Sequence, residues 1–469
     1  MQLFNKFATF LEILIKYNQM STDIRIKKGL DIKLKGKAKH EKAVASRSKI
    51  FTIYPDDFHA IKPKLSIREG DKVLAGDSLF YNKDYQAMQF VSPVSGVIKE
   101  IKRGAKRKVL EIVIQADNQD THKDFGVKTP SNLAEPQVKQ SLLESGCWSF
   151  IKQRPYDIVA NPDKSPKAIF VSGFNSNPNG TNIPFSLKGK EEAFQAGIDA
   201  LLKLTEGKVH LSVNEKSFLN EVKNVVLHHV SGPHPAGNVG TQINKIDPVN
   251  KGETVYTVNA LDVAIIGELF LTGKYNPVRT VAVAGSRVGK PQYFDVRIGN
   301  GMQEIVKDAN FDLKDTRVIS GNVFTGLNVG ENGTFRHFSY SVTGIPEGNY
   351  YELFGWAKPV FGNKKYSITR ALTFTWLNPK QEFDLDTNTN GEQRAFVVTG
   401  FYEKVFPLDI LPLQILKSCM YEDLEEMEAL GMYEVAPEDF ALTEFVCISK
   451  QPHQDIIRKG LDLMIKEIG

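Results

Sequence analysis

Several short motifs of this 469-residue chain hold residue types that carry chemistry in other proteins, and each lacks an essential part. The segment AGSRVGKP at 284–291 comes close to a phosphate-binding loop, in which GxxxxGK and a following Ser or Thr hold phosphate and magnesium. One residue is missing between Gly285 and Gly289, and Pro291 occupies the place of the hydroxyl. The segment therefore predicts a β-turn.

Neither the carboxylates nor the histidines are spaced as metal ligands. DTNTNG at 386–391 fits the first half of a calcium loop, but the twelfth position, which needs a bidentate Glu, is Val397. It is interpreted as a polar linker. His228, His229 and His234 lack a helical HxxxH spacing. The glycines around them, in SGPHPAGNVG, indicate a conformationally special loop.

The three cysteines, Cys147, Cys419 and Cys447, lie far apart and form no CxxC. We therefore expect no zinc site or iron–sulfur cluster built by this chain alone. A sparse, odd number of cysteines fits a reducing cytoplasm. The chain also lacks GxSxG, and it lacks a nucleotide-binding GxGxxG after a strand. On motifs alone, it has no catalytic site of its own.

The elements around these motifs begin with an all-β module at residues 62–114. Short apolar runs alternate there with turns at Gly70, Gly76, Pro93–Gly96 and Gly104. Phrases such as IREGDKVLAGDSL and SPVSGVIKEI resemble the biotinyl/lipoyl carrier domain, a flattened barrel of two hammerheads. A carrier domain presents a lysine at a hairpin tip, and Lys83 is the candidate here. Its neighbours form neither Asp-Lys-Ala nor Met-Lys-Met, so we expect an ordinary surface lysine.

Strand and helix patterns alternate after a polar linker at 117–140. Apolar runs predict strands at 167–172, 209–213 and 225–228, an amphipathic helix at 190–204, and helical structure over 253–275 that ends at Gly273. Such alternation indicates an α/β layer with parallel pairing. Residues 277–299 predict a strand, a turn and a strand. Residues 316–376 are expected to be mainly β, and the part after 380–394 mainly helical.

Charge is distributed unevenly along the chain. The formal net charge of +4 is too small to indicate nucleic-acid binding, and no apolar run reaches the roughly 18–20 residues that span a bilayer. Residues 24–49 carry ten Lys or Arg against two acids, whereas residues 403–447 carry eleven acids against two bases. This asymmetry favours docking to partners or to a membrane surface. The alternative is solvated surface charge.

Residues 1–19 place five apolar side chains on one helical stripe. Glu12 interrupts the apolar run and no small-residue cleavage site follows, so a secretory signal fits poorly. An amphipathic anchor is one interpretation. The preferred one is that Met20 is the natural start and that the residues before it are an extension.

The ordered set of segments resembles a known family from about residue 24 to the C-terminus. It comprises the module above and the phrases IRIKKGLDIKLKG, SGPHPAGNVGTQI, AVAGSRVGKPQYFDVRIG, ELFGW, FPLDILP, EDFALTEFVC and IIRKG. Together they resemble the A-subunit family of the sodium-translocating NADH:quinone oxidoreductases. That family is similar in design to the flavin-binding subunit of complex I and to the C subunit of the Rnf complex.

The resemblance implies an α+β multidomain fold with four parts. These are a biotinyl/lipoyl-like β barrel-sandwich, a Rossmann-like α/β domain, a β-grasp (SLBB) domain near 277–310, and a helical C-terminal domain. The expected boundaries are 21–118, 125–255, 256–376 and 380–469, after the extension at 1–20.

Two departures from the relatives bear on mechanism. Where a glycine-rich loop would let the backbone approach a flavin phosphate, this chain reads ESGCWSFIKQRPYD, with Trp148, Phe150 and Ile151 in place of glycine. Where relatives carry clustered cysteines, it keeps Cys419 and Cys447. We expect no covalently bound cofactor and no metal here. FMN, FAD, riboflavin and iron–sulfur centres are expected in partner subunits.

A quinone site remains a candidate. It needs an apolar slot with a few hydrogen-bond donors at the carbonyl groups. Two segments have suitable residues and match stretches that the family associates with quinone; their candidates are Tyr54, Asp56, Asp57 and Phe58, and Trp148, Phe150, Arg154 and Tyr156. The alternative is that these side chains belong to the core and to interfaces.

The sequence thus predicts a peripheral subunit on the cytoplasmic side of the bacterial inner membrane. Its complex would pass electrons from NADH to quinone and drive sodium outward, as a translocase. Its partners would be subunits B to F, chiefly the membrane-embedded B subunit, and quinone, with no nucleic acid. The alternatives are a free-standing carrier protein modified on its hammerhead lysine and a soluble flavoprotein dehydrogenase, against which the missing glycine-rich loop argues.

Overall fold

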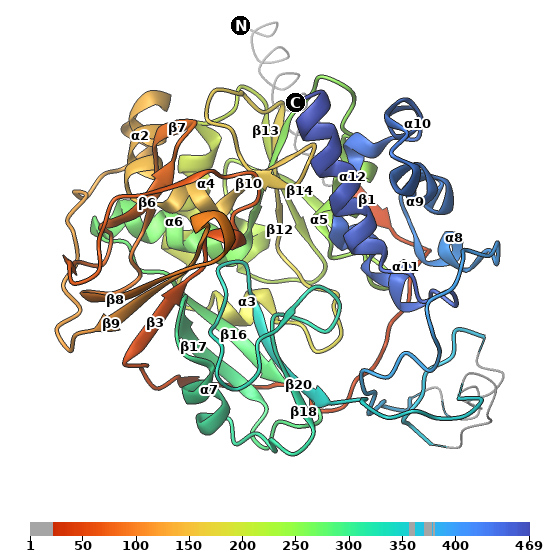
Figure 1. Cartoon of the computed structure of the whole chain (residues 1–469). Coiled ribbons are helices and arrows are strands. Elements are labelled where there is room, and N and C mark those ends of the chain that lie inside the picture. The colour runs from red at the N-terminus through yellow and green to blue at the C-terminus, as the bar shows by residue number, and fades with distance from the viewer. Residues whose placement is uncertain (1–21, 356–361, 370–377, 379) are drawn as a thin grey trace, which may run out of the picture.

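The computed structural model describes residues 22–355, 362–369, 378 and 380–469, in which four sheets and a group of helices pack together (Figure 1). The extension at residues 1–20 lies outside the described residues, as does part of the predicted β region up to 376. Within the described part of the chain, no helix has the length and apolar content needed to cross a membrane.

Residues 50–116 form a two-sheet β module, as predicted. One sheet has the strand order β3-β9-β8-β5 and the other β4-β6-β7. The strands are β3 (Ile50–Ile53), β4 (Pro63–Leu65), β5 (Lys72–Val73), β6 (Ser78–Asn82), β7 (Tyr85–Val91), β8 (Gly96–Arg103) and β9 (Val109–Ala116). Phe80 of β6 and Phe90 of β7 are cross-strand neighbours, and their buried rings stack with centroids 4.6 Å apart. Exposed Lys83 lies in the two-residue turn between β6 and β7.

The second layer is a seven-stranded sheet, β1-β14-β13-β12-β15-β10-β11, in which β1 and β12 to β15 run parallel. Its strands are β1 (Thr22–Arg25), β10 (Ile151–Arg154), β11 (Ile158–Val159), β12 (Ala168–Ser172), β13 (Lys208–Val213), β14 (Val226–Ser231) and β15 (Val255–Asn259). The associated helices are α2 (Glu135–Glu144), α3 (Ile183–Ser186), α4 (Glu191–Leu202), α5 (Val239–Ile246) and α6 (Ala260–Thr272).

Helices α4 and α6 cross closely because each has a glycine at the crossing. A Cβ on Gly267 would lie 1.7 Å from the carbonyl oxygen of Ala193, and one on Gly197 would lie 2.0 Å from that of Val263. The prediction of helix over all of 253–275 was wrong at its start. Residues 255–259 form the buried strand β15 between β12 and β10, and the helix begins only after Asn259 caps it.

The third layer is a six-stranded sheet, β19-β18-β20-β16-β17-β2. Its elements are β2 (Lys39–Val44), β16 (Val278–Ala284), β17 (Gln292–Arg297), β18 (Thr316–Ser320), β19 (Leu327–Asn328), β20 (Ser341–Pro346) and α7 (Met302–Asp308). The predicted strand FRHFSYSV is irregular up to 340. The carbonyl groups of His337 and Ser339 accept hydrogen bonds from the buried Arg279 side chain instead of joining a ladder.

The first two strands, β1 and β2, do not belong to the β module in which the sequence analysis placed them. Although residues 21–118 were expected to form one β domain, β1 pairs with β14 and β2 pairs with β17. The β module begins only at β3. Alternating apolar residues specify a strand but not its partner, which is why the pattern missed this exchange.

The C-terminal part is helical and packs beside the seven-stranded sheet (Figure 1). Its helices are α8 (Phe401–Val405), α9 (Pro412–Tyr421), α10 (Leu424–Ala429), α11 (Ala441–Phe445) and α12 (His453–Glu467), with 3₁₀ turns η6 (Met432–Glu434) and η7 (Pro437–Phe440). They enclose a separate apolar cluster around Leu416, Met432 and Leu461.

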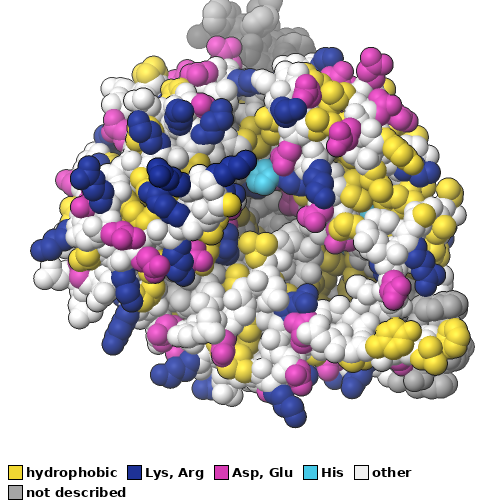
Figure 2. Space-filling model, viewed as in Figure 1, with side chains coloured by type: hydrophobic (Ala, Val, Ile, Leu, Met, Phe, Trp, Pro, Cys, Tyr) yellow, Lys and Arg dark blue, Asp and Glu magenta, His cyan; other side chains and the backbone are white. Residues whose placement is uncertain are grey.

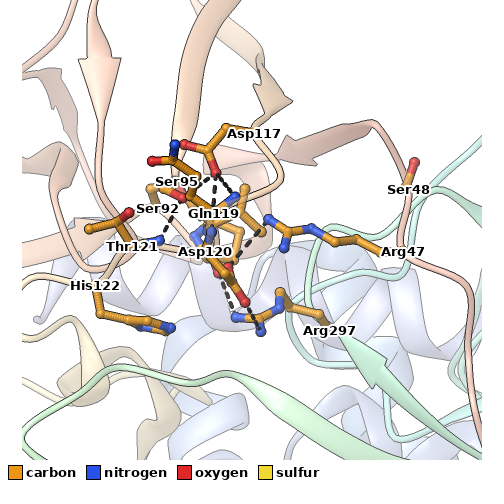
Figure 3. Close-up of polar contacts among 12 residues, drawn as sticks. Arg47, Ser48, Ser92, Ser95, Asp117, Gln119, Asp120, Thr121, His122 and Arg297 are labelled. Carbon is orange, nitrogen blue, oxygen red and sulfur yellow. Dashed lines mark hydrogen bonds and ion pairs between the residues drawn. The ribbon is translucent and has the colours of Figure 1, made fainter.

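A polar junction joins the β module to the six-stranded sheet (Figure 3). Asp120 forms ion pairs with Arg297 of β17 at 3.0 Å and with Arg47 at 3.3 Å. Arg297 also donates to the carbonyl of Pro93 at 2.9 Å. Asp117 holds the backbone of this bend, since it accepts hydrogen bonds from the N–H groups of residues 119 and 120. The junction fixes the β module against the rest of the molecule.

Candidate ligand cavity

All four parts of the chain line one cavity of about 450 Å³. It lies at the carboxyl ends of β12 and β15, where Ser172 and Asn259 face it, and next to Asn238 at the start of α5. In the sheet, β12 has β13, the next strand of the chain, on one side and β15 on the other, so the connections diverge at the carboxyl end of β12. Such a point of divergence is where open α/β sheets bind ligands. Figure 2 shows the molecular face hollowed between the β module and the C-terminal helices.

The turn η1 (Pro55–Asp57) forms one wall with an ion pair. Arg336 contacts the Asp57 carboxylate at 2.6 Å, and the ring of Tyr54 covers the Arg336 guanidinium with its centroid 3.6 Å away. Burial raises the pKa of Asp57, although Arg336 and the N–H of His337 oppose this. Asp57 and Arg336 line the cavity, while Tyr54 lies one layer behind and orients Arg336.

Arg154 from β10 supports the part of the wall that Glu438 forms. Its side chain, only 1% exposed, donates to Asp439 at 2.6 Å, to Glu438 at 3.1 Å and to the carbonyl of Glu434 at 2.9 Å. Glu438 lines the cavity, and its side chain is 39% exposed. Burial, followed by the neighbouring Asp439, raises the pKa of Glu438 to about 7, against the effect of Arg154.

Gly240 lets this ion pair approach the first turn of α5. A Cβ at that position would lie 2.3 Å from Oδ1 of Asp439 and 2.5 Å from Nη1 of Arg154. The Asp439 carboxylate therefore lies at the helix N-terminus, where the helix dipole stabilises negative charge. The C-terminal helical part thus supplies an anion at this site.

Aromatic rings and one lysine complete the interior. Phe150 lines the cavity and stacks on the buried ring of His337, with centroids 4.9 Å apart. Lys152 contacts Asp157 at 3.2 Å, and its ammonium lies 4.7 Å from the ring centroid of Phe338. Burial alone would raise the pKa of Asp157, but the nearby cations, Lys152 first, hold it below its ordinary value.

The eight predicted site residues take different places. Asp56, Asp57 and Phe150 line the cavity, and Tyr54 and Arg154 support residues that line it. The other three belong to the interior: Phe58 packs on Phe90 and His337, Trp148 donates its indole N–H to the carbonyl of Ala160 at 2.8 Å, and Tyr156 packs in the C-terminal helical cluster. For these three, no contact with the cavity supports the quinone interpretation.

Sequence reasoning missed Lys152, Arg336, Phe338 and Glu438 as lining residues. Lys152 lies inside a segment that the sequence already indicated, and the signal that could have found it is its place two residues after Phe150 and two before Arg154. Nothing in the sequence marks the others, because they arrive from distant segments. The SGPHPAGNVG loop, predicted to be conformationally special, lines the cavity through Gly237 and Asn238.

The charge of the lining limits what the cavity can hold. Four carboxyl groups, Asp56, Asp57, Asp157 and Glu438, face two cations, Lys152 and Arg336. This balance disfavours a phosphate-bearing ligand and favours a neutral one. Among the described residues, no group of three or more His, Cys, Asp or Glu side chains is placed to hold a metal ion.

Comparison with known proteins defines the class first. Three family models match in chain order: the NqrA N-terminal barrel-sandwich hybrid domain at 24–117, the NqrA second alpha/beta domain at 133–275 and the NQRA C-terminal domain, an SLBB model, at 280–331. The class is therefore a multidomain protein with a barrel-sandwich module, an α/β layer and an SLBB domain.

Full-length relatives then specify the family. The chain is 35% identical over 443 residues to the A subunit of the Na(+)-translocating NADH-quinone reductase of Cellvibrio japonicus, covering 93% of this chain and 98% of that one. It is also 35% identical to proteins of the same description from Neisseria meningitidis serogroup B, covering 95% of this chain and 100% of that one, and from Vibrio atlanticus with the same coverage. The chain belongs to the A-subunit family of Na⁺-translocating NADH-quinone reductase, a translocase complex. Solved chains of an NAD⁺-reducing [NiFe]-hydrogenase align over 46% of this chain with 11% identity and a TM-score of 0.32.

Proposed function

We propose that this chain is a peripheral subunit on the cytoplasmic side of the bacterial inner membrane, and that its cavity binds the headgroup of a quinone. Electrons would pass from NADH to quinone through FMN, FAD, riboflavin and iron–sulfur centres in subunits B to F. This chain would support their assembly, chiefly on the membrane-embedded B subunit. The proposal includes a Rossmann-like assignment for the seven-stranded sheet and a separate helical domain after residue 380.

One observation carries the quinone proposal. The two candidate segments, 54–58 and 148–156, lie far apart in the sequence, yet Asp57 and Phe150 line the same cavity. The volume of about 450 Å³ falls within the roughly 300–1,000 Å³ of small-molecule sites. A quinone headgroup is neutral, which suits a lining in which carboxyl groups outnumber cations.

The lining also offers the contacts that a quinone ring needs. Apolar surface comes from Phe150, Phe174, Ile183, Val239, Val258 and Phe338. Quinone carbonyl groups accept hydrogen bonds, and Lys152 and the amide of Asn238 can donate them. With its pKa raised to about 7, Glu438 is partly protonated at neutral pH and can also donate.

Quinone titration of the purified chain tests the cavity. Short-chain ubiquinone and menaquinone analogues are added, and binding is followed by calorimetry. Thr325→Trp should abolish binding, because Thr325 is an exposed lining residue and the indole would fill the space. Lys152→Met should weaken it by about tenfold, the loss of one charge-assisted hydrogen bond. Leu313→Trp, at an exposed position outside the cavity, is the matched control. Equal affinity in all four chains would refute the cavity as the quinone site.

Membership of the complex has a separate test. A tagged chain is recovered from detergent-solubilised membranes, and the co-purified proteins are identified by mass spectrometry. We expect the membrane-embedded redox subunits with it. Their absence would refute the assignment, and a covalent adduct on Lys83 or a flavin absorption band would support one of the two alternatives.

A further inference from the structure

The hairpin of β8 and β9 carries the densest positive charge of the β module. Residues 97–110, here called the basic hairpin, contain one acid, Glu100, and six cations: Lys99, Lys102, Arg103, Lys106, Arg107 and Lys108. All six cations are exposed. The apolar side chains of Val97 and Leu110 are exposed beside them, at 37% and 39%.

Most of these cations have no acidic partner within the described residues. Lys102 pairs with Glu111 and Lys108 with Asp56, both at 2.8 Å. In the same part of the chain, the structure gives no acidic partner to Lys99, Arg103, Lys106 or Arg107. Lys106 and Arg107 also have positive φ angles of 53° and 61°, so the cationic tip is held in a tight turn by the strands on either side.

The opposite side of the molecule has the opposite charge. The eleven acids of residues 403–447 lie on the C-terminal helical part, and α9 and α10 lie across the molecule from β8 and β9 (Figure 1). Figure 2 shows basic side chains predominating over the β module and acidic ones around the C-terminal helices. A negatively charged plane would therefore attract the β module and repel the helical end.

We propose that the basic hairpin is the surface that contacts the membrane, through anionic lipid headgroups. This rests on the proposed function, which places the chain beside a membrane without a helix of the described residues crossing it. The cytoplasmic leaflet carries a negative surface potential, and each Lys or Arg near it contributes about 1 kcal/mol. Exposed Val97 and Leu110 add apolar contact to the interfacial region.

The hairpin also connects the membrane surface with the cavity. Lys108, at the end of its turn, pairs with Asp56, which lines the cavity. Contact of the hairpin with lipid would therefore place the cavity next to the bilayer, where a lipid-soluble quinone is held. An acidic protein segment is the competing occupant, and the test separates the two.

The test is co-sedimentation of the purified chain with vesicles. One set contains phosphatidylcholine alone, and the other contains equal parts of phosphatidylcholine and phosphatidylglycerol. We expect binding to the anionic vesicles only, with an affinity that falls as salt is added. The triple variant Lys99→Gln, Lys106→Gln and Arg107→Gln should bind about 100-fold more weakly, because three charges are lost at about 1 kcal/mol each.

The control carries the same loss of net charge elsewhere. Lys216, Lys223 and Lys314 are exposed and lie outside the β module, and their combined change to Gln should leave affinity within about threefold. Equal losses in both triple variants would overturn the hairpin as the specific contact, as would binding to neutral vesicles alone. Thermal unfolding of each variant confirms that it is folded.

Failure of this inference is distinguishable from failure of the proposed function. If the chain does not bind anionic vesicles but still co-purifies with membrane subunits, the lipid contact is refuted and membership of the complex is supported. If, in that case, the hairpin variant alone loses the membrane subunits, the hairpin contacts protein. A chain that binds anionic vesicles through the hairpin but recovers no membrane subunits supports the inference and refutes the function.

Discussion

Replacing Arg154 with Met should detach the C-terminal helices from the sheet without breaking either. The guanidinium is 1% exposed, and its partner Asp439 is fully buried, 2.6 Å away. The substitution keeps the volume of the side chain. It leaves the Asp439 carboxylate buried, with the backbone N–H of Ala436, at 2.9 Å, as its remaining donor among the described residues. Removing one partner of a buried ion pair costs about 3–5 kcal/mol, because the other charge stays uncompensated.

The loss of stability should be confined to the contact between the C-terminal helices and the sheet. The chain has several apolar clusters, so a single unfolding free energy does not describe it. Hydrogen exchange measures the opening of separate regions. In Arg154→Met, amides of α12 and of the η7 turn should exchange about 100-fold faster or more, which corresponds to at least about 3 kcal/mol. Amides of β8 and β9 should be unchanged.

A double-mutant cycle supplies the control. Asp439→Asn alone should also be costly, but the combined variant should recover part of the loss, since no buried charge is left unpaired. Lys251→Met, which removes an exposed ion pair with Glu428 at 3.0 Å, should leave exchange unchanged. The reasoning is refuted if Arg154→Met accelerates exchange less than about fivefold, or if the two single effects simply add.

Three further outcomes are expected. The folded state raises the pKa of Glu438 to about 7 and so favours the protonated carboxyl group. The stability that this proton binding adds is present at low pH and is lost as pH rises through about 7. Glu438→Gln should remove that part of the pH dependence of urea unfolding, and an unchanged pH profile would contradict the assignment. Gly240→Ala should destabilise the contact between α5 and the η7 turn by about 1–3 kcal/mol, because its Cβ would displace Asp439 and Arg154. Hydrogen exchange of the η7 amides should become faster to match, whereas slower exchange in α5, as expected from helix propensity alone, would disprove the close contact. Asp120→Asn should weaken the junction of Figure 3 by about 1–2 kcal/mol, because Arg47 and Arg297 both lose their anionic partner. We expect faster hydrogen exchange confined to residues 117–122 and their neighbours. Unaltered exchange there would contradict this prediction.

Local patterns in the sequence predicted most of the elements but not their partners. The turns of the β module fall at Gly70 and Gly76, both with positive φ, as the alternation of apolar runs and glycines predicts. Residues 21–118 were expected to form one β domain, yet its first two strands, β1 and β2, pair with β14 and β17. Pairing across such distances depends on which surfaces become buried together, and no local pattern contains that information.

The candidate site shows the same division. The aromatic residues of segments 54–58 and 148–156 were predicted as quinone-site candidates from their residue types. In the structure they are divided between the cavity and the core. Phe58 and Trp148 are apolar enough for either place, so residue type alone did not separate the two. Arg154 was singled out as a quinone ligand, and the structure gives it carboxylate partners in another part of the chain.

By itself, the sequence determined the kinds of elements, the turns between them and the unequal charge of the two ends, because each depends on residues close together in the chain. It also determined the family, through phrases long enough to be specific. Only the tertiary structure decided which strands pair, that Arg336 and Glu438 meet across one cavity, and that the basic hairpin faces away from the acidic helices. Those arrangements are set by burial of surfaces from all four parts at once, and desolvation and opposite charge act over distances in space, not along the sequence.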